Sequence, residues 1–176
     1  MTTQSILTEV PVNQNYVQPN KFSFYFPTLS FTRFFVQSVN IPDVSTQEVF
    51  IPTQFNPTYR HGDQLNFDPL VITVLVDEDM KVWEESFNWL RALTSPKQYS
   101  EYIKNGGFKN LNTPYADAVL IINTNSNIPN LKFTFKDCHP TSLTGLGFSS
   151  SASPDQPMTA SITYRYDYFT IERFSS

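Results

Sequence analysis

The stretch from Asp63 to Leu93, DQLNFDPLVITVLVDEDMKVWEESFNWLRAL, most narrows what this chain can fold into. Its segment Leu70–Val76 is an apolar run, which predicts a strand covered on both faces. Asp77, Glu78 and Asp79 follow, where carboxylates accept hydrogen bonds from the unpaired N–H groups of a helix start. The pattern predicts a strand, a turn and a helix over about residues 78–94. The predicted core-facing stripe of the helix is Met80, Trp83, Phe87 and Leu90.

The remainder of the chain reads as strands. Aromatic residues make up 15% of it, with sixteen Phe and nine Tyr, and these favour β structure. We predict a mainly β single domain over residues 1–176, with an extended N-terminal arm over 1–20, a polar loop over 53–62 and a long Ser/Pro-rich loop over 137–157. The predicted strands are Lys21–Phe26, Phe31–Val39, Thr46–Ile51, Pro69–Val76, Asp117–Asn123, Leu131–Lys136 and Met158–Phe169.

The charge and the cysteine content exclude several classes of protein. The net charge is −4 and no run of Lys or Arg occurs, so neither a nucleic-acid grip nor an anionic membrane surface is expected. No apolar segment is long enough to span a bilayer as a helix. Cys138 is the only cysteine, and the N-terminus MTTQSILTEV lacks the pattern of a signal peptide. We therefore expect folding in a reducing cytoplasm, without a disulfide within the chain.

The titratable residues do not form a convincing catalytic or metal site. Cys138 and His139 are adjacent, and neighbouring strand residues point to opposite faces, so a buried inert Cys and a surface His are predicted. Asp63 and the Asp77–Asp79 cluster lack the spacing of a calcium loop, and helix capping accounts for the cluster. We expect no catalytic residue, no metal and no cofactor.

Four stretches, taken in order, give the chain a family resemblance. They are VQSVNIP (36–42), Leu65–Leu90 with its strand, acidic turn and Trp-containing helix, DCHPTSL (137–143) and SITYRYDYF (161–169). In this respect the chain resembles the tail tube proteins of contractile-tailed bacteriophages over about residues 13–174. The resemblance implies an antiparallel β-sandwich or barrel with one flanking helix. It also implies a structural virion protein that forms hexameric rings, which stack into a tube crossed by DNA.

The same resemblance leads to a set of expected contacts. We expect the partners to be further copies of the chain, with tail sheath and baseplate proteins, in a virion tail assembled in the host bacterial cytoplasm. Edge strands would pair within a ring, because unpaired N–H and C=O groups recruit another strand. Six chains of net charge −4 would give a ring a net charge of six times −4, or −24. An acidic bore would repel DNA phosphates. The expected contacts between rings are Phe55, Asn56, Tyr59, Arg60, Leu143 and Phe148, and those within a ring are Phe22, Phe24, Tyr164 and Tyr166.

Other functions stay open at this level. Within the same fold, the chain can be a tube initiator, a baseplate protein or a tail terminator. From a different class, it can be a monomeric β-barrel that binds a ligand among its aromatic residues. A hydrolase that uses Asp63 or Asp77 is the third alternative.

Overall fold

The computed structural model describes residues 14–27, 29, 32–94, 115–151, 153 and 155–174. Residues 1–13 of the predicted arm and the segment 95–114 lie outside these ranges. The elements in chain order are β1 (Phe22–Tyr25), α1 (Thr32–Phe35), β2 (Val36–Val39), β3 (Val44–Ile51), β4 (Thr58–Phe67), β5 (Leu70–Leu75), α2 (Lys81–Thr94), β6 (Ala116–Asn123), β7 (Pro129–Leu143), β8 (Thr159–Arg165) and β9 (Phe169–Arg173).

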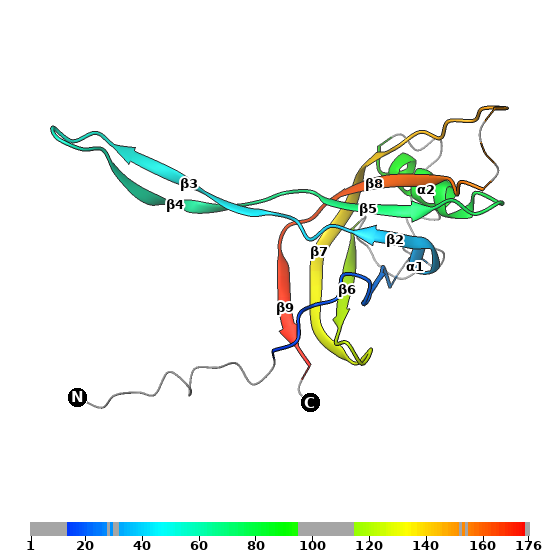
Figure 1. Cartoon of the computed structure of the whole chain (residues 1–176). Coiled ribbons are helices and arrows are strands. Elements are labelled where there is room, and N and C mark those ends of the chain that lie inside the picture. The colour runs from blue at the N-terminus through cyan, green and yellow to red at the C-terminus, as the bar shows by residue number, and fades with distance from the viewer. Residues whose placement is uncertain are drawn as a thin grey trace.

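The strands of the body follow one antiparallel path that folds over itself. The order is β1-β6-β7-β8-β5-β2, and β9 pairs with β7. Strand β7 bends, with Asp137 at a φ of 55°, and so belongs to two sheets. Its first part pairs with β6 and β9, and its last residues pair with β8. A first sheet (β1, β6, β7, β9) therefore faces a second sheet (β7, β8, β5, β2), as the family resemblance implies for a sandwich (Figure 1).

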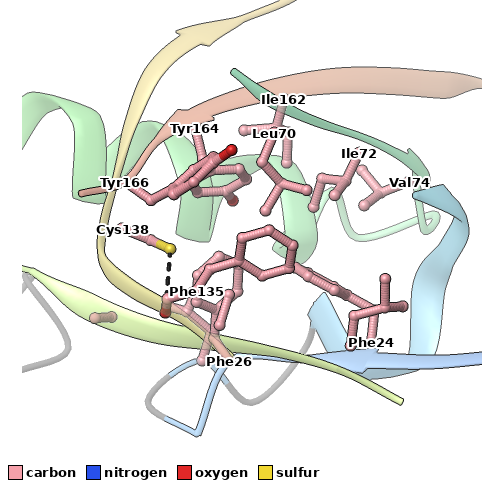
Figure 2. Close-up of a cluster of buried hydrophobic side chains, with 14 of the residues drawn as sticks. Phe24, Phe26, Leu70, Ile72, Val74, Phe135, Cys138, Ile162, Tyr164 and Tyr166 are labelled. Carbon is pink, nitrogen blue, oxygen red and sulfur yellow. Dashed lines mark hydrogen bonds between the residues drawn. The ribbon is translucent and has the colours of Figure 1, made fainter. Parts of the chain in front are cut away.

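The core lies between the two sheets. Strands β5 and β8 each turn alternate side chains inward, among them Ile72 and Ile162, which are cross-strand partners. Phe26 meets Tyr164 with ring centroids 4.9 Å apart, and Cys138 lies beside them at the bend of β7 (Figure 2). The outward residues of β5 are only partly covered, so the prediction of a strand covered on both faces holds fully for one face.

Helix α2 is present, but its buried face differs from the predicted one. The buried residues are Val82, Ser86, Trp89 and Ala92. Trp89 packs against Phe26 and Tyr164, with ring centroids 5.6 and 5.8 Å apart. Of the predicted stripe, Trp83 is partly buried and packs against the core, but the stripe is not the buried face, because the helix carries large apolar residues on two sides and Trp89 occupies the aromatic cluster of the core. Phe87 remains 39% exposed.

The acidic turn before α2 acts as the predicted cap. The Val82 N–H donates to Asp77 Oδ1 over 3.2 Å, and Asp79 forms an ion pair with Lys81. Partial desolvation tends to raise the pKa of Asp77, but the hydrogen bonds from the backbone N–H groups of Val82 and Lys81 prevail and lower it. The helix begins at Lys81, after Met80 at a φ of 56°. Asp77 therefore contributes to helix formation, and no metal is needed to account for it.

Four further predicted segments differ from the structure. The predicted strand Met158–Phe169 is interrupted, because β8 ends at Arg165 and β9 begins at Phe169. The first half of the predicted strand 31–39 is helical, because α1 places Thr32 in the core, where its Oγ1 donates to Glu85 Oε2. The predicted loop 53–62 is shorter, because β4 begins at Thr58. The predicted loop 137–157 begins only after Leu143, because β7 continues through Pro140 to pair with β8. Neither helix of the described ranges has the length and hydropathy needed to cross a membrane.

Candidate functional site

The β3–β4 hairpin projects from the body as a long arm (Figure 1). It forms a two-stranded sheet of its own, separate from the sheets of the body. All residues of β3 are exposed, and so is most of β4. A lone two-stranded hairpin is only marginally stable in water, because neither of its faces has a core to cover it. An arm of this kind therefore has surface to offer a partner.

The outer half of the arm is rich in exposed apolar side chains. Phe50 and Tyr59 are cross-strand partners whose ring centroids lie 5.7 Å apart. Val49 and Ile51 lie on the opposite face of β3, and Phe55 at the tip is 90% exposed. Exposed apolar residues gathered in this way are typical of an interaction site.

An irregularity in the middle of the arm depends on one glycine. Between the pairs Thr46↔Leu65 and Glu48↔His61 the register shifts, so β4 carries more residues than β3 over this stretch. A Cβ atom at Gly62 would collide with the backbone oxygen of Gln47. Only glycine allows this close approach, so Gly62 shapes the arm.

The residues predicted for contacts between rings occupy two distant places. Phe55, Asn56, Tyr59 and Arg60 gather on the outer half of the arm, and all four are exposed. Leu143 ends β7 and packs against the core. Phe148 is exposed and belongs to the segment after β7, and this segment runs on the side of the molecule away from the arm (Figure 1). The structure therefore brings the first four together and leaves the last two elsewhere.

The edge strands of the body agree only in part with the prediction. Strand β1 lies at one end of the strand path, and Phe24 on it is buried while Phe22 is partly buried. Strand β8 is not an edge strand, because it pairs with both β5 and β7. Tyr164 and Tyr166 are buried in the core, so the prediction that they lie on an edge is wrong. Within the described residues, β9 pairs with β7 alone and β2 with β5 alone.

The outer face of the first sheet carries paired charges. Lys132 Nζ lies 3.1 Å from Glu172 Oε2, and Lys136 is bonded to Asp117. The hydrogen bond from Lys136 to Asp117, helped by the negative charge of that carboxylate, raises the pKa of Lys136. Both lysines of this face therefore have a carboxylate partner within the same chain.

The residues that the structure describes give no support to a catalytic centre. Cys138 is fully buried, and burial raises the pKa of its thiol to about 12, so it is not a nucleophile at neutral pH. His139 is half-buried beside Tyr115 and not on the surface as predicted. Among the described residues, no group of three or more His, Cys, Asp or Glu is placed to hold a metal ion.

Sequence reasoning missed several exposed apolar residues. Ile171 of β9 is 58% exposed, and Phe50 of β3 is similarly open. On α2, the exposed Phe87 stacks on the partly buried Trp83 with ring centroids 5.3 Å apart, and the Trp83 Nε1–H donates to the Thr144 carbonyl. One signal in the sequence could have indicated the exposure of β3. The residues Val44–Ile51 lack the polar–apolar alternation of a strand with one buried face.

A comparison with protein families finds one that covers almost the whole chain. Residues 5–172 match the family model of the phage tail tube protein. The tail tube terminator protein of Enterobacteria phage T4 is 24% identical over 140 residues, which span 78% of this chain and 76% of that protein.

Solved structures show the same fold. The tube terminating cap of the anti-feeding prophage is similar with a TM-score of 0.68 at 13% identity, over 97% of this chain and 100% of that one. The sheath/tube terminator of an extracellular contractile injection system, in its extended state, is similar with a TM-score of 0.59 at 15% identity, over 91% and 99%. The sheath-tube complex of that system contains a chain similar with a TM-score of 0.57, also at 15% identity, over 99% of both chains.

Proposed function

The chain belongs to the phage tail tube protein family, and from that premise we propose that it is a structural protein that terminates a tail tube. Its relatives in that family are structural proteins and not enzymes. The terminator role is supported by the likeness to the T4 terminator over most of both chains. A likeness in fold to a sheath-tube complex favours the tube subunit itself as the second candidate.

The observation that carries the proposal is the exposed arm. Both faces of β3 are open to solvent, and the apolar side chains of the outer half have no cover in the single chain. Contact with a neighbouring subunit would remove this surface from water and stabilise the hairpin. In the proposed assembly six copies form a ring, and the arms attach the ring to the next ring of the tube.

The surroundings of such a ring follow from the same proposal. The ring sits in the tail of a virion, next to sheath and baseplate proteins, after assembly in the host cytoplasm. DNA passes through it without specific binding. The paired lysines of the first sheet support this if that sheet lines the bore, because Lys132 and Lys136 already have carboxylate partners.

The arm can be shortened without disturbing its register. Glu48 and His61 are cross-strand partners, so replacing residues 49–60 by Asn-Gly keeps them as the closing pair of the hairpin and removes the apolar outer half. We expect this variant to keep the circular dichroism spectrum and the melting temperature of the body, and to lose attachment to tubes. Gly62→Ala tests the shape of the arm, and Gly145→Ala is its control, because a Cβ there meets nothing within 4 Å.

Electron microscopy of mixtures with the tube subunit of the same tail separates the two candidates. A gold-labelled terminator is expected at one end of each tube, and a labelled tube subunit all along it. If the shortened variant still binds tubes as well as the full chain does, the role of the arm is wrong. If the full chain never joins a tube, the proposed function itself is wrong.

A further inference from the structure

A groove with both polar and apolar walls opens between β1, at the edge of the first sheet, and β2, at the edge of the second. Its two adjoining parts have volumes of about 570 and 520 Å³, and both have Phe22 and Gln37 in their walls. The first sheet contributes Phe22, Phe24, Leu120 and Ile122, and the second contributes Val36 and Val39. The core of the sandwich therefore reaches the surface between two sheet edges that do not pair with each other.

The opposite edge of the first sheet carries an apolar side chain that has the inward orientation but lies largely in solvent. In β9, Ile171 is the partner of Phe133, which in turn is the partner of Leu120. Cross-strand partners share a face, so Ile171 lies on the core face of the first sheet. Phe169 of the same face packs against Phe67 and Phe135, whereas Ile171 remains 58% exposed.

The directions of the strands make these two edges complementary. All pairings in the first sheet are antiparallel, so β1 and β9 run in opposite directions. Rotation of a copy about an axis along the strands keeps the direction of each strand. In a ring with that axis, β9 of one copy therefore lies antiparallel to β1 of the next, and among the described strands each has one edge without a strand partner.

From this arrangement we propose that the groove between β1 and β2 binds β9 of the adjacent copy of this chain. The inference rests on the ring of the proposed function and deepens it. When β9 adds to β1, Ile171 lies opposite Phe22 or Phe24, on the same face, and enters the groove. The contact is head-to-tail and uses two different surfaces of the chain, which is the kind of contact that closes rings.

Disulfide cross-linking tests the strand pairing. Ser23 and Glu172 both lie on the outer face of the first sheet, and opposed residues of antiparallel strands are close enough for a disulfide. Under oxidation, the double variant Ser23→Cys/Glu172→Cys, or Ser23→Cys/Thr170→Cys for the shifted register, should give a ladder of linked chains on a non-reducing gel. Ser23→Cys/Asp155→Cys is the control. Cys138 adds little background because it is buried.

A pair of matched substitutions tests the filling of the groove. Ile171 and Ile128 are 58% and 61% exposed, so Ile171→Ser and Ile128→Ser should change the melting temperature of the single chain equally little. Only Ile171→Ser should weaken ring formation, with the midpoint concentration in size-exclusion chromatography raised about tenfold or more.

The outcomes separate the groove from the ring. A ladder from the β1–β9 variants alone, together with selective loss of rings in Ile171→Ser, supports the proposal. If rings persist in Ile171→Ser, or if rings form but the β1–β9 double-cysteine variants give no ladder, the groove proposal is overturned and the proposed function still stands. A wild-type chain that forms no rings, alone or on tubes, overturns the proposed function and the groove proposal together.

Discussion

The orientation of helix α2 makes the sharpest prediction for stability. Replacement of Trp89 by Ala removes a side chain that is 1% exposed and touches Phe26 and Tyr164. A buried aromatic side chain covers about 150–250 Å². At about 25 cal/mol per Å² this area corresponds to roughly 4–6 kcal/mol, and measured Trp→Ala changes in cores cost about 3–5 kcal/mol. We expect a loss in the free energy of unfolding of about 3–5 kcal/mol.

Phe87→Ala on the same helix is the matched control. Phe87 is 39% exposed and stacks on Trp83 at the surface, so its removal leaves no closed cavity. We expect it to cost about 1 kcal/mol. For a chain of this length, about 2–4 °C in melting temperature corresponds to each kcal/mol, so Trp89→Ala should lower the melting temperature by about 10 °C.

The assay is urea denaturation monitored by circular dichroism. The slope of the free energy of unfolding against urea concentration is compared between variants. A larger loss in Phe87→Ala than in Trp89→Ala would refute the described orientation of the helix. It would support instead the stripe of Met80, Trp83, Phe87 and Leu90 that the sequence pattern predicts. Trp89→Phe, which keeps a ring in the same place, should recover part of the loss if packing is the cause.

Two further predictions concern charged residues. The lowered pKa of Asp77 means that its ionised form favours the folded state, so its contribution is present above the unfolded pKa of about 3.9 and is lost as the pH falls through the lower folded value. Asp77→Ala should therefore have a lower melting temperature than the wild type at pH 7, and this difference should close in acid. Asp77→Asn, which still caps the helix, should melt close to the wild type. A difference in melting temperature between Asp77→Ala and the wild type that widens in acid contradicts this reasoning. Asp117→Asn frees Lys136, so if the first sheet lines the bore of the proposed ring, rings of this variant should retain DNA about tenfold better at 50 mM salt, with the gain lost by about 200 mM. Asp155→Asn makes the same charge change elsewhere, and an equal gain in both variants would show that the Lys136 pair is not what matters.

The sequence correctly predicted the elements that are determined by residues close together along the chain. The apolar run at Leu70–Leu75 is a strand, the carboxylate of Asp77 caps a helix, and the alternation of Phe22 and Phe24 marks β1. Each of these follows from neighbouring residues alone, through strand periodicity or the unpaired N–H groups of a helix start. The family resemblance, confirmed by the match over residues 5–172, added the sandwich and its flanking helix.

Choices between two locally acceptable arrangements required the tertiary structure. Helix α2 has large apolar residues on two sides, and only the position of Phe26 and Tyr164 selects Trp89 for the core. The sequence pattern predicts residues 58–61 to be part of a polar loop, yet they pair with β3 in an arm without a core.

The Asp63–Leu93 stretch by itself therefore determined that a strand, a capped turn and a helix follow one another in this chain. Only the tertiary structure decided which face of that helix is buried, which strands are edges and where apolar surface remains open. The physical reason is that strand and helix periodicity depend on residues a few positions apart. Edges, grooves and exposed arms depend on residues such as Phe22 and Ile171, which lie far apart in the sequence.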